Sequence, residues 1–222
     1  AYSTSPFHVP AGPEIYTVDA DAAVFVIARN AGEGADRRAE KGDYFLSDEE
    51  YTLLSDVCDR YEKVILLLNS GGVVDLSFLE KLPQIQAVLA VSQPGQEGGT
   101  AVADVISGIV SPSGKLTDTW AFSYDDYPNA ATFSHNNGNI EEEKYEEGIY
   151  VGYRYFDTFE IPVRYGFGYG MSYASFSINT ARIETSENGE VRVKVKVKKL
   201  TAGSFPENEV VQLYDIPSSR KD

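Results

Sequence analysis

Residues 23–37 read AVFVIARNAGEGADR, and this stretch decides the fold. Its first six residues form a continuous apolar run, which is typical of a strand covered on both faces in a parallel sheet. A glycine-flanked acidic loop follows at once, and α/β proteins commonly place their chemistry in such loops. The alternative is that Gly32 and Gly34 only permit a tight turn and that Glu33 is a solvated surface acid.

The alternation of strand and helix continues through the first half of the chain. Ser47 and Glu50 have the spacing of a capping box, and apolar residues then recur at helical spacing as far as Tyr61. Helical and strand periodicities predict further elements at residues 63–69, 78–82, 85–91 and 99–110. We therefore expect a layered α/β sandwich with a mostly parallel sheet and its functional loops at the carboxyl ends of the strands.

The second half of the chain changes character. Residues 121–171 are rich in tyrosine and glycine with weak periodicity, which indicates a connector anchored by aromatic side chains. Residues 172–222 are β-like: Val191, Val193, Val195 and Val197 alternate with cationic residues, and Val210 to Tyr214 suggest another strand. We expect three parts: an α/β domain over 1–120 whose N-terminal strands are missing, the connector, and an all-β sandwich cut short, since a complete one needs about seven strands.

Composition argues against several function classes. The chain has 34 acidic and 19 basic residues and a formal charge of −15, which disfavours nucleic acid and anionic membrane surfaces as partners. No apolar run approaches the roughly 20 residues that span a bilayer. The single cysteine allows neither an internal disulfide nor a thiolate metal site, and with only two histidines a histidine-based mechanism is not expected. We predict no cofactor and no metal. A nucleotide-binding domain is disfavoured because no Gly-x-Gly-x-x-Gly motif lies at a strand-to-helix turn.

Six ordered motifs together resemble glycoside (glycosyl) hydrolase family 3, the β-glucosidase type, over nearly the whole chain. They are AGEGADR (31–37), KGDYFLS (41–47), QPGQEGG (93–99), PSGKL (112–116), YEEGIYVGYRY (145–155) and FGYGMSY (167–173). The resemblance implies the α/β sandwich domain of that family followed by the start of a fibronectin type III-like domain. It also implies a TIM-like barrel carrying the nucleophilic aspartate, which this sequence does not contain.

The same resemblance implies site residues. Glu33 matches the family's general acid/base, one of two carboxyls that stand about 5–5.5 Å apart in a retaining glycosidase. Asp36 and Arg37 belong to the same motif, and either contact the glycone, orient the loop, or form a local ion pair that shapes the turn. Gln96 and Glu97 are interpreted as caps of a helix N-terminus rather than as a second catalytic carboxylate site.

The resulting functional hypothesis is a fragment of an exo-β-glucosidase. Such an enzyme hydrolyses terminal non-reducing β-D-glucosyl residues from a β-linked glucoside or oligosaccharide, and the fragment alone is expected to be inactive without the barrel domain. The alternatives are a β-xylosidase-type member of the family and a non-catalytic carbohydrate-binding or scaffold module.

Overall fold

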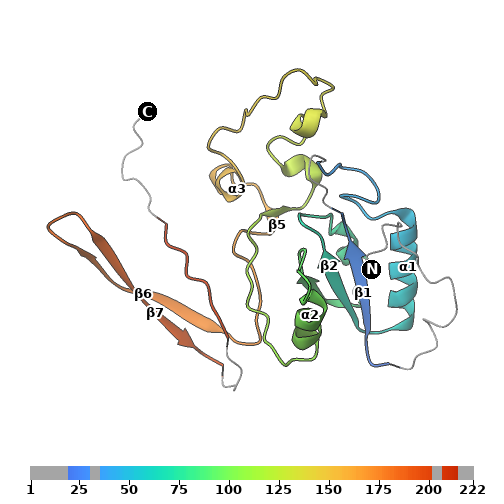
Figure 1. Cartoon of the computed structure of the whole chain (residues 1–222), viewed down its shortest axis with the longest axis horizontal. Coiled ribbons are helices and arrows are strands. Elements are labelled where there is room, and N and C mark those ends of the chain that lie inside the picture. The colour runs from blue at the N-terminus through green and yellow to red at the C-terminus, as the bar shows by residue number, and fades with distance from the viewer. Residues whose placement is uncertain (1–19, 31–35, 202–206, 215–222) are drawn as a thin grey trace. The chain divides into compact units, whose positions relative to one another are not determined.

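The computed structural model describes residues 20–30, 36–201 and 207–214 (Figure 1). These residues form two compact units. The first contains the described residues up to 95 together with 122–146, and the second contains 96–121 and the described residues from 147 onward. The division at residues 120 and 171 stays a prediction.

A three-stranded parallel sheet forms the centre of the first unit. Its strands are β1 (Ala23–Ala28), β2 (Val64–Asn69) and β3 (Ile85–Ala90), in the order β1-β2-β3. Ala23 of β1 pairs with Val64 of β2, and Val64 pairs in turn with Ile85 of β3. The α/β class and the parallel sheet predicted from the apolar runs are confirmed, and the strand bounds agree within one residue.

Helix α1 (Asp48–Arg60) connects β1 to β2 and begins at the predicted capping box. The Ser47 hydroxyl oxygen accepts a hydrogen bond from the Glu50 amide at 3.1 Å, and the Glu50 carboxylate accepts one from the Ser47 amide at 2.8 Å. Both bonds satisfy amide groups that have no partner within the helix. The helix buries Leu54 and Cys58, so the lone cysteine is a core residue as expected, and burial raises the pKa of its thiol.

The core of this unit follows the central strand. Val64 and Leu66 of β2, Leu54 of α1 and Ile27 of β1 are fully buried. Burial on both faces was expected for β1 as well, but Val24 and Val26 are 48% and 42% exposed. Strand β1 lies at an edge of the described sheet, and its alternate side chains point away from the buried face.

Shorter elements complete the first unit. They are the 3₁₀ turns η2 (Ser77–Glu80), η3 (Tyr124–Asp126) and η4 (Phe133–His135). The first corresponds to the short helix predicted near residues 78–82.

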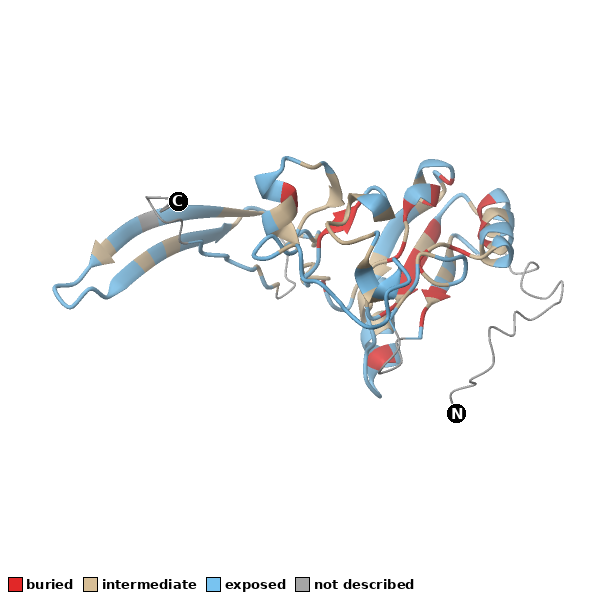
Figure 2. Ribbon diagram, turned by 90° about the horizontal axis from the view of Figure 1, so that it is seen from above, coloured by how far each residue is buried: buried red, intermediate tan, exposed pale blue. Residues whose placement is uncertain are grey.

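The second unit combines two short helices with two antiparallel strand pairs. Its elements are α2 (Gly98–Ile106), β4 (Trp120–Ala121), α3 (Tyr153–Thr158), β5 (Val163–Tyr165), β6 (Phe176–Thr185) and β7 (Val191–Lys199). Strand β4 pairs with β5, and β6 pairs with β7. Of the side chains described on β6 and β7, none is buried, as Figure 2 shows by its tan and pale blue colouring of this hairpin.

The strand predicted at residues 210–214 is wrong. Residues 207–214 contain no strand, although Val210, Val211 and Tyr214 are residues that favour one. A strand needs a neighbouring backbone to exchange hydrogen bonds, and this segment is held by side chains instead. Glu209 forms an ion pair with Lys115 at 3.2 Å, and the Tyr214 ring meets the Tyr153 ring edge-on at 5.9 Å.

Candidate functional site

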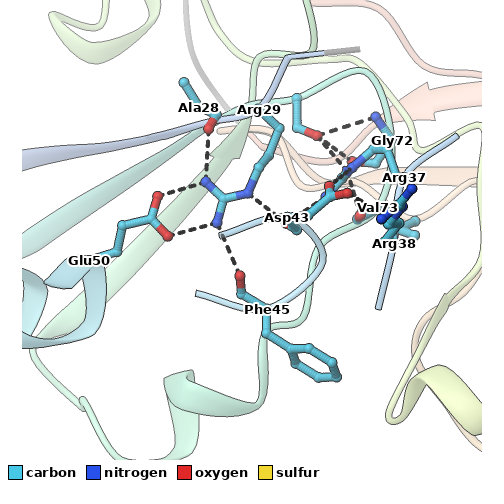
Figure 3. Close-up of polar contacts among 10 residues, drawn as sticks. Ala28, Arg29, Arg37, Arg38, Asp43, Phe45, Glu50, Gly72 and Val73 are labelled. Carbon is cyan, nitrogen blue, oxygen red and sulfur yellow. Dashed lines mark hydrogen bonds and ion pairs between the residues drawn. The ribbon is translucent and has the colours of Figure 1, made fainter. Parts of the chain in front are cut away.

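The candidate site lies at the carboxyl ends of β1 and β2 in the first unit. Arg29 directly follows β1 and Ser70 directly follows β2. Glu33 falls in residues 31–35, outside the described residues, so the structure defines only the two stems that flank this segment. Figure 3 shows the polar contacts that hold those stems.

Arg29 anchors the first stem. Its guanidinium donates two hydrogen bonds to the Glu50 carboxylate, at 2.7 and 2.8 Å, in a bidentate pair. The remaining N–H groups donate to backbone oxygens, including that of Ala28 at 2.8 Å and that of Asp43 at 2.6 Å. The Arg29 side chain is only 4% exposed. Bidentate pairs of this kind combine strong attraction with fixed geometry.

Arg37 anchors the second stem. Its Nε donates to the Asp43 Oδ1 atom at 2.6 Å, and its Nη2 donates to the Asp43 backbone oxygen at 2.7 Å. Its Nη1 reaches the loop after β2, where it donates to the Ser70 hydroxyl at 2.9 Å and to the Val73 carbonyl at 2.8 Å. Arg37 therefore ties its stem to the end of the neighbouring strand.

The structure separates the two residues predicted beside Glu33. Arg37 is partly buried and its ion-pair partner is Asp43, whereas Asp36 is exposed. Whether either contacts a sugar stays a prediction.

Four side chains of this network were not predicted from the sequence, namely those of Arg29, Asp43, Glu50 and Ser70. A cation directly after a buried strand was the available signal for Arg29. Glu50 was noticed only as part of the capping box, yet its Oε2 atom accepts from both the Ser47 amide and Arg29. One carboxylate thus joins the start of α1 to the loop stem.

An aromatic cluster lies beside this network. The Tyr44 ring packs edge-on against Phe45 at 4.9 Å and against Tyr124 at 5.2 Å. Tyr44 is buried, and burial raises the pKa of its phenol, with smaller contributions from Tyr127 and Asp75 among its neighbours. The cluster connects the loop before α1 to the segment around η3.

The raised pKa of Tyr44 predicts a loss of stability in alkaline solution. Above about pH 10, the ordinary value for tyrosine, the unfolded chain releases this proton while the folded chain retains it. The free energy of unfolding should therefore fall with rising pH, with a Tyr44 contribution of up to about 1.4 kcal/mol per pH unit. Urea unfolding of wild type and Tyr44→Phe between pH 8 and 11.5 tests this. The Phe variant should show the shallower decline, with the exposed Tyr145→Phe as control, and parallel curves for wild type and Tyr44→Phe would contradict it.

Glu97 occupies the N-cap position of α2, as expected for the Gln96–Glu97 pair. Its side chain accepts no capping hydrogen bond, so only the predicted position is confirmed. Across residues 20–30, 36–201 and 207–214, no group of three His, Cys, Asp or Glu side chains is arranged to hold a metal ion. Within those same ranges, no helix has the length and apolar character needed to cross a bilayer.

Comparison with known proteins gives a consistent set of relatives. Residues 14–153 match the family model described as the glycosyl hydrolase family 3 C-terminal domain. A β-glucosidase of Ruminococcus albus is 42% identical over 195 residues, covering 87% of this chain and 20% of that protein. β-Glucosidase A of Butyrivibrio fibrisolvens is 36% identical, covering 92% of this chain and 29% of its own length.

The solved structures include β-glucosidase 3B from Thermotoga neapolitana in complex with α-D-glucose. It matches this chain with a TM-score of 0.73 at 41% identity, over 82% of this chain and 26% of that one. The chain therefore spans between a fifth and three tenths of the length of these relatives.

Proposed function

This chain belongs to glycosyl hydrolase family 3 as a β-glucosidase-like C-terminal domain, and on that premise we propose that it supplies the general acid/base of a retaining exo-β-glucosidase. The observation that carries the proposal is the anchoring of both stems of residues 30–36. Arg29 and Arg37 fix these stems at the carboxyl edge of a parallel sheet, where α/β proteins place their reactive groups. Glu33 is the carboxylic acid at the centre of that loop.

The chemistry assigns Glu33 two successive tasks. In the first step it donates its proton to the glycosidic oxygen while a carboxylate on the opposite side attacks the anomeric carbon. In the second step the Glu33 carboxylate takes a proton from water, which then cleaves the glycosyl–enzyme bond. The attacking carboxylate belongs to a barrel domain, and its negative charge would help to keep Glu33 protonated before the first step.

Arg37 and Asp36 take different parts in this proposal. The contacts of Arg37 to Asp43, Ser70 and Val73 favour a role in orienting the loop. Asp36 is exposed next to the loop and is the better placed of the two to contact a glycone. The proposed substrate is a terminal β-D-glucosyl residue, following the β-glucosidases among the relatives. A β-xyloside is the alternative glycone, because residues of the barrel would select between them.

A chimaera tests the proposal. The segment of the R. albus β-glucosidase that aligns with this chain is replaced by the present sequence, to which it is 42% identical. We expect the chimaera to release phenol from phenyl β-D-glucoside, whereas the purified 222-residue chain should not. Turnover by the isolated chain that is abolished by Glu33→Gln would overturn the assignment of the nucleophile to another domain. Saturable binding of glucose or cellobiose to the isolated chain would favour the carbohydrate-binding module instead.

A further inference from the structure

We propose that Asp43 is a positioning residue for proton transfer, because it binds both Arg29 and Arg37, the residues that flank the loop of residues 30–36. This inference rests on the proposed function of Glu33. Asp43 lies in the loop between β1 and α1, in the KGDYFLS motif, and no catalytic role was derived for it from the sequence.

Asp43 accepts hydrogen bonds from both sides of the loop. Its backbone oxygen accepts from Arg29 Nε at 2.6 Å and from Arg37 Nη2 at 2.7 Å, so one atom binds both stems. Its carboxylate oxygens accept separately, Oδ1 from Arg37 Nε at 2.6 Å and Oδ2 from the Arg38 amide at 2.6 Å. Figure 3 shows these contacts converging on Asp43.

Burial and charge strengthen the contacts that hold Arg29 and Arg37 in place. The side chains of Arg29 and Arg37 are 4% and 19% exposed, and each is paired with a carboxylate, Glu50 for Arg29 and Asp43 for Arg37. Hydrogen bonds between ionised groups are stronger than neutral ones, and partial exclusion of water strengthens them further. Of the two carboxylates, only that of Asp43 also binds the backbone of the second stem, through the Arg38 amide.

Proton transfer is sensitive to this kind of support. A general acid must lie within about 2.6–3.2 Å of the oxygen that it protonates. A misplacement of about 1 Å can lower the rate about a hundredfold, even when the change lies away from the reacting atoms. A looser second stem should therefore impair protonation of the leaving group while leaving sugar binding intact.

The first arm of the test uses the 222-residue chain and the isosteric variant Asp43→Asn. Each carboxylate oxygen of Asp43 now accepts one of these bonds, Oδ1 from Arg37 and Oδ2 from the Arg38 amide. In Asp43→Asn a donor-only NH2 group replaces one of the two oxygens and faces one of these N–H groups, so one bond is lost in the present geometry. We expect hydrogen exchange of the Arg38 amide to accelerate about tenfold or more, with exchange in β2 unchanged. The matched control is Asp75→Asn, whose carboxylate also accepts two local hydrogen bonds, from the amide and hydroxyl of Ser77, without contacting the stems. Equal exchange at Arg38 in wild type and Asp43→Asn would overturn the anchoring.

The second arm measures kcat/KM of the chimaera with two leaving groups. For phenyl β-D-glucoside, which needs protonation, Asp43→Asn should lower kcat/KM by about tenfold to a hundredfold. For 2,4-dinitrophenyl β-D-glucoside, which leaves without a proton, the loss should stay under about threefold, whereas a general structural defect would lower both equally.

The two proposals fail in different ways. Equal losses with both leaving groups, or no loss with either, would overturn the role of Asp43 while Glu33 kept its assignment. If Glu33→Gln itself left the phenyl substrate unaffected, the proposed function would fall, and with it the catalytic part of this inference.

Discussion

Glu33→Gln is expected to lower kcat/KM of the chimaera for phenyl β-D-glucoside by about a hundredfold to ten-thousandfold. This is the usual range for the loss of a positioned general acid. Glutamine has nearly the shape of glutamic acid but cannot release a proton to the leaving oxygen. In the proposed mechanism the attacking carboxylate lies in another domain and is unchanged by this substitution, so the chimaera should still bind the sugar and react with any substrate whose leaving group needs no proton.

The same variant should behave differently with 2,4-dinitrophenyl β-D-glucoside. For this substrate kcat/KM reports only the first step, in which the glycosyl–enzyme forms. The kcat/KM of the variant should change little, because the leaving group is a stable anion. Its kcat should fall, since water attacks the glycosyl–enzyme slowly without a general base. In the smaller variant Glu33→Ala, added azide should restore turnover and yield a β-glucosyl azide, because an anionic nucleophile needs no base.

Glu62→Gln is the matched control for this prediction. Glu62 is exposed in the first unit and lies in the turn between α1 and β2, at the end of the sheet opposite the candidate site. Its kinetics should equal those of the unmodified chimaera. If Glu33→Gln lowered kcat/KM by the same factor for the phenyl and the 2,4-dinitrophenyl substrates, the role of Glu33 as the general acid would be contradicted.

The fold was largely predictable because local signals agreed with the tertiary structure. The apolar runs that became β1, β2 and β3 are bounded by polar or turn-forming residues, and the Ser47–Glu50 spacing marked the start of α1 within one residue. The strand predicted from the alternation at residues 191–198 is likewise present as β7, because its partner β6 directly precedes it in the chain. Residues 210–214 contain β-favouring side chains but have no partner strand, and there the prediction failed.

The anchoring network was not predictable by the same reasoning. Arg29 and Glu50 are 21 residues apart and meet because the first turn of α1 lies beside the end of β1, whereas Arg37 and Ser70 are 33 apart and meet at the paired ends of β1 and β2. Glu50 already had a sufficient local explanation in the capping box, which concealed its second partner. Periodicity and spacing reveal helices and strands, whereas a charged contact between loops depends on how those elements pack.

Arg29→Met is expected to lower the free energy of unfolding of the 222-residue chain by about 3–5 kcal/mol. Removing one partner of a buried ion pair leaves the other charge without compensation. Here the Glu50 carboxylate, 15% exposed, would lose its bidentate cation, and the backbone oxygens of Ala28, Asp43 and Phe45 would lose a donor. Urea unfolding followed by circular dichroism measures the effect, with Arg38→Met as the exposed-arginine control at under about 0.5 kcal/mol.

Two further variants separate the ion pair from the helix cap that shares Glu50. Ser47→Ala removes the capping hydroxyl but leaves Arg29 bound, and should cost about 1 kcal/mol. The double variant Arg29→Met with Glu50→Met removes both charges, so it should be more stable than Arg29→Met alone, because no carboxylate is left buried and unpaired. A double variant less stable than the single one would mean that Glu50 stabilises the chain mainly through the cap. In that case Arg29 would contribute through its bonds to backbone oxygens, and the stem of the loop would be held by hydrogen bonding rather than by charge.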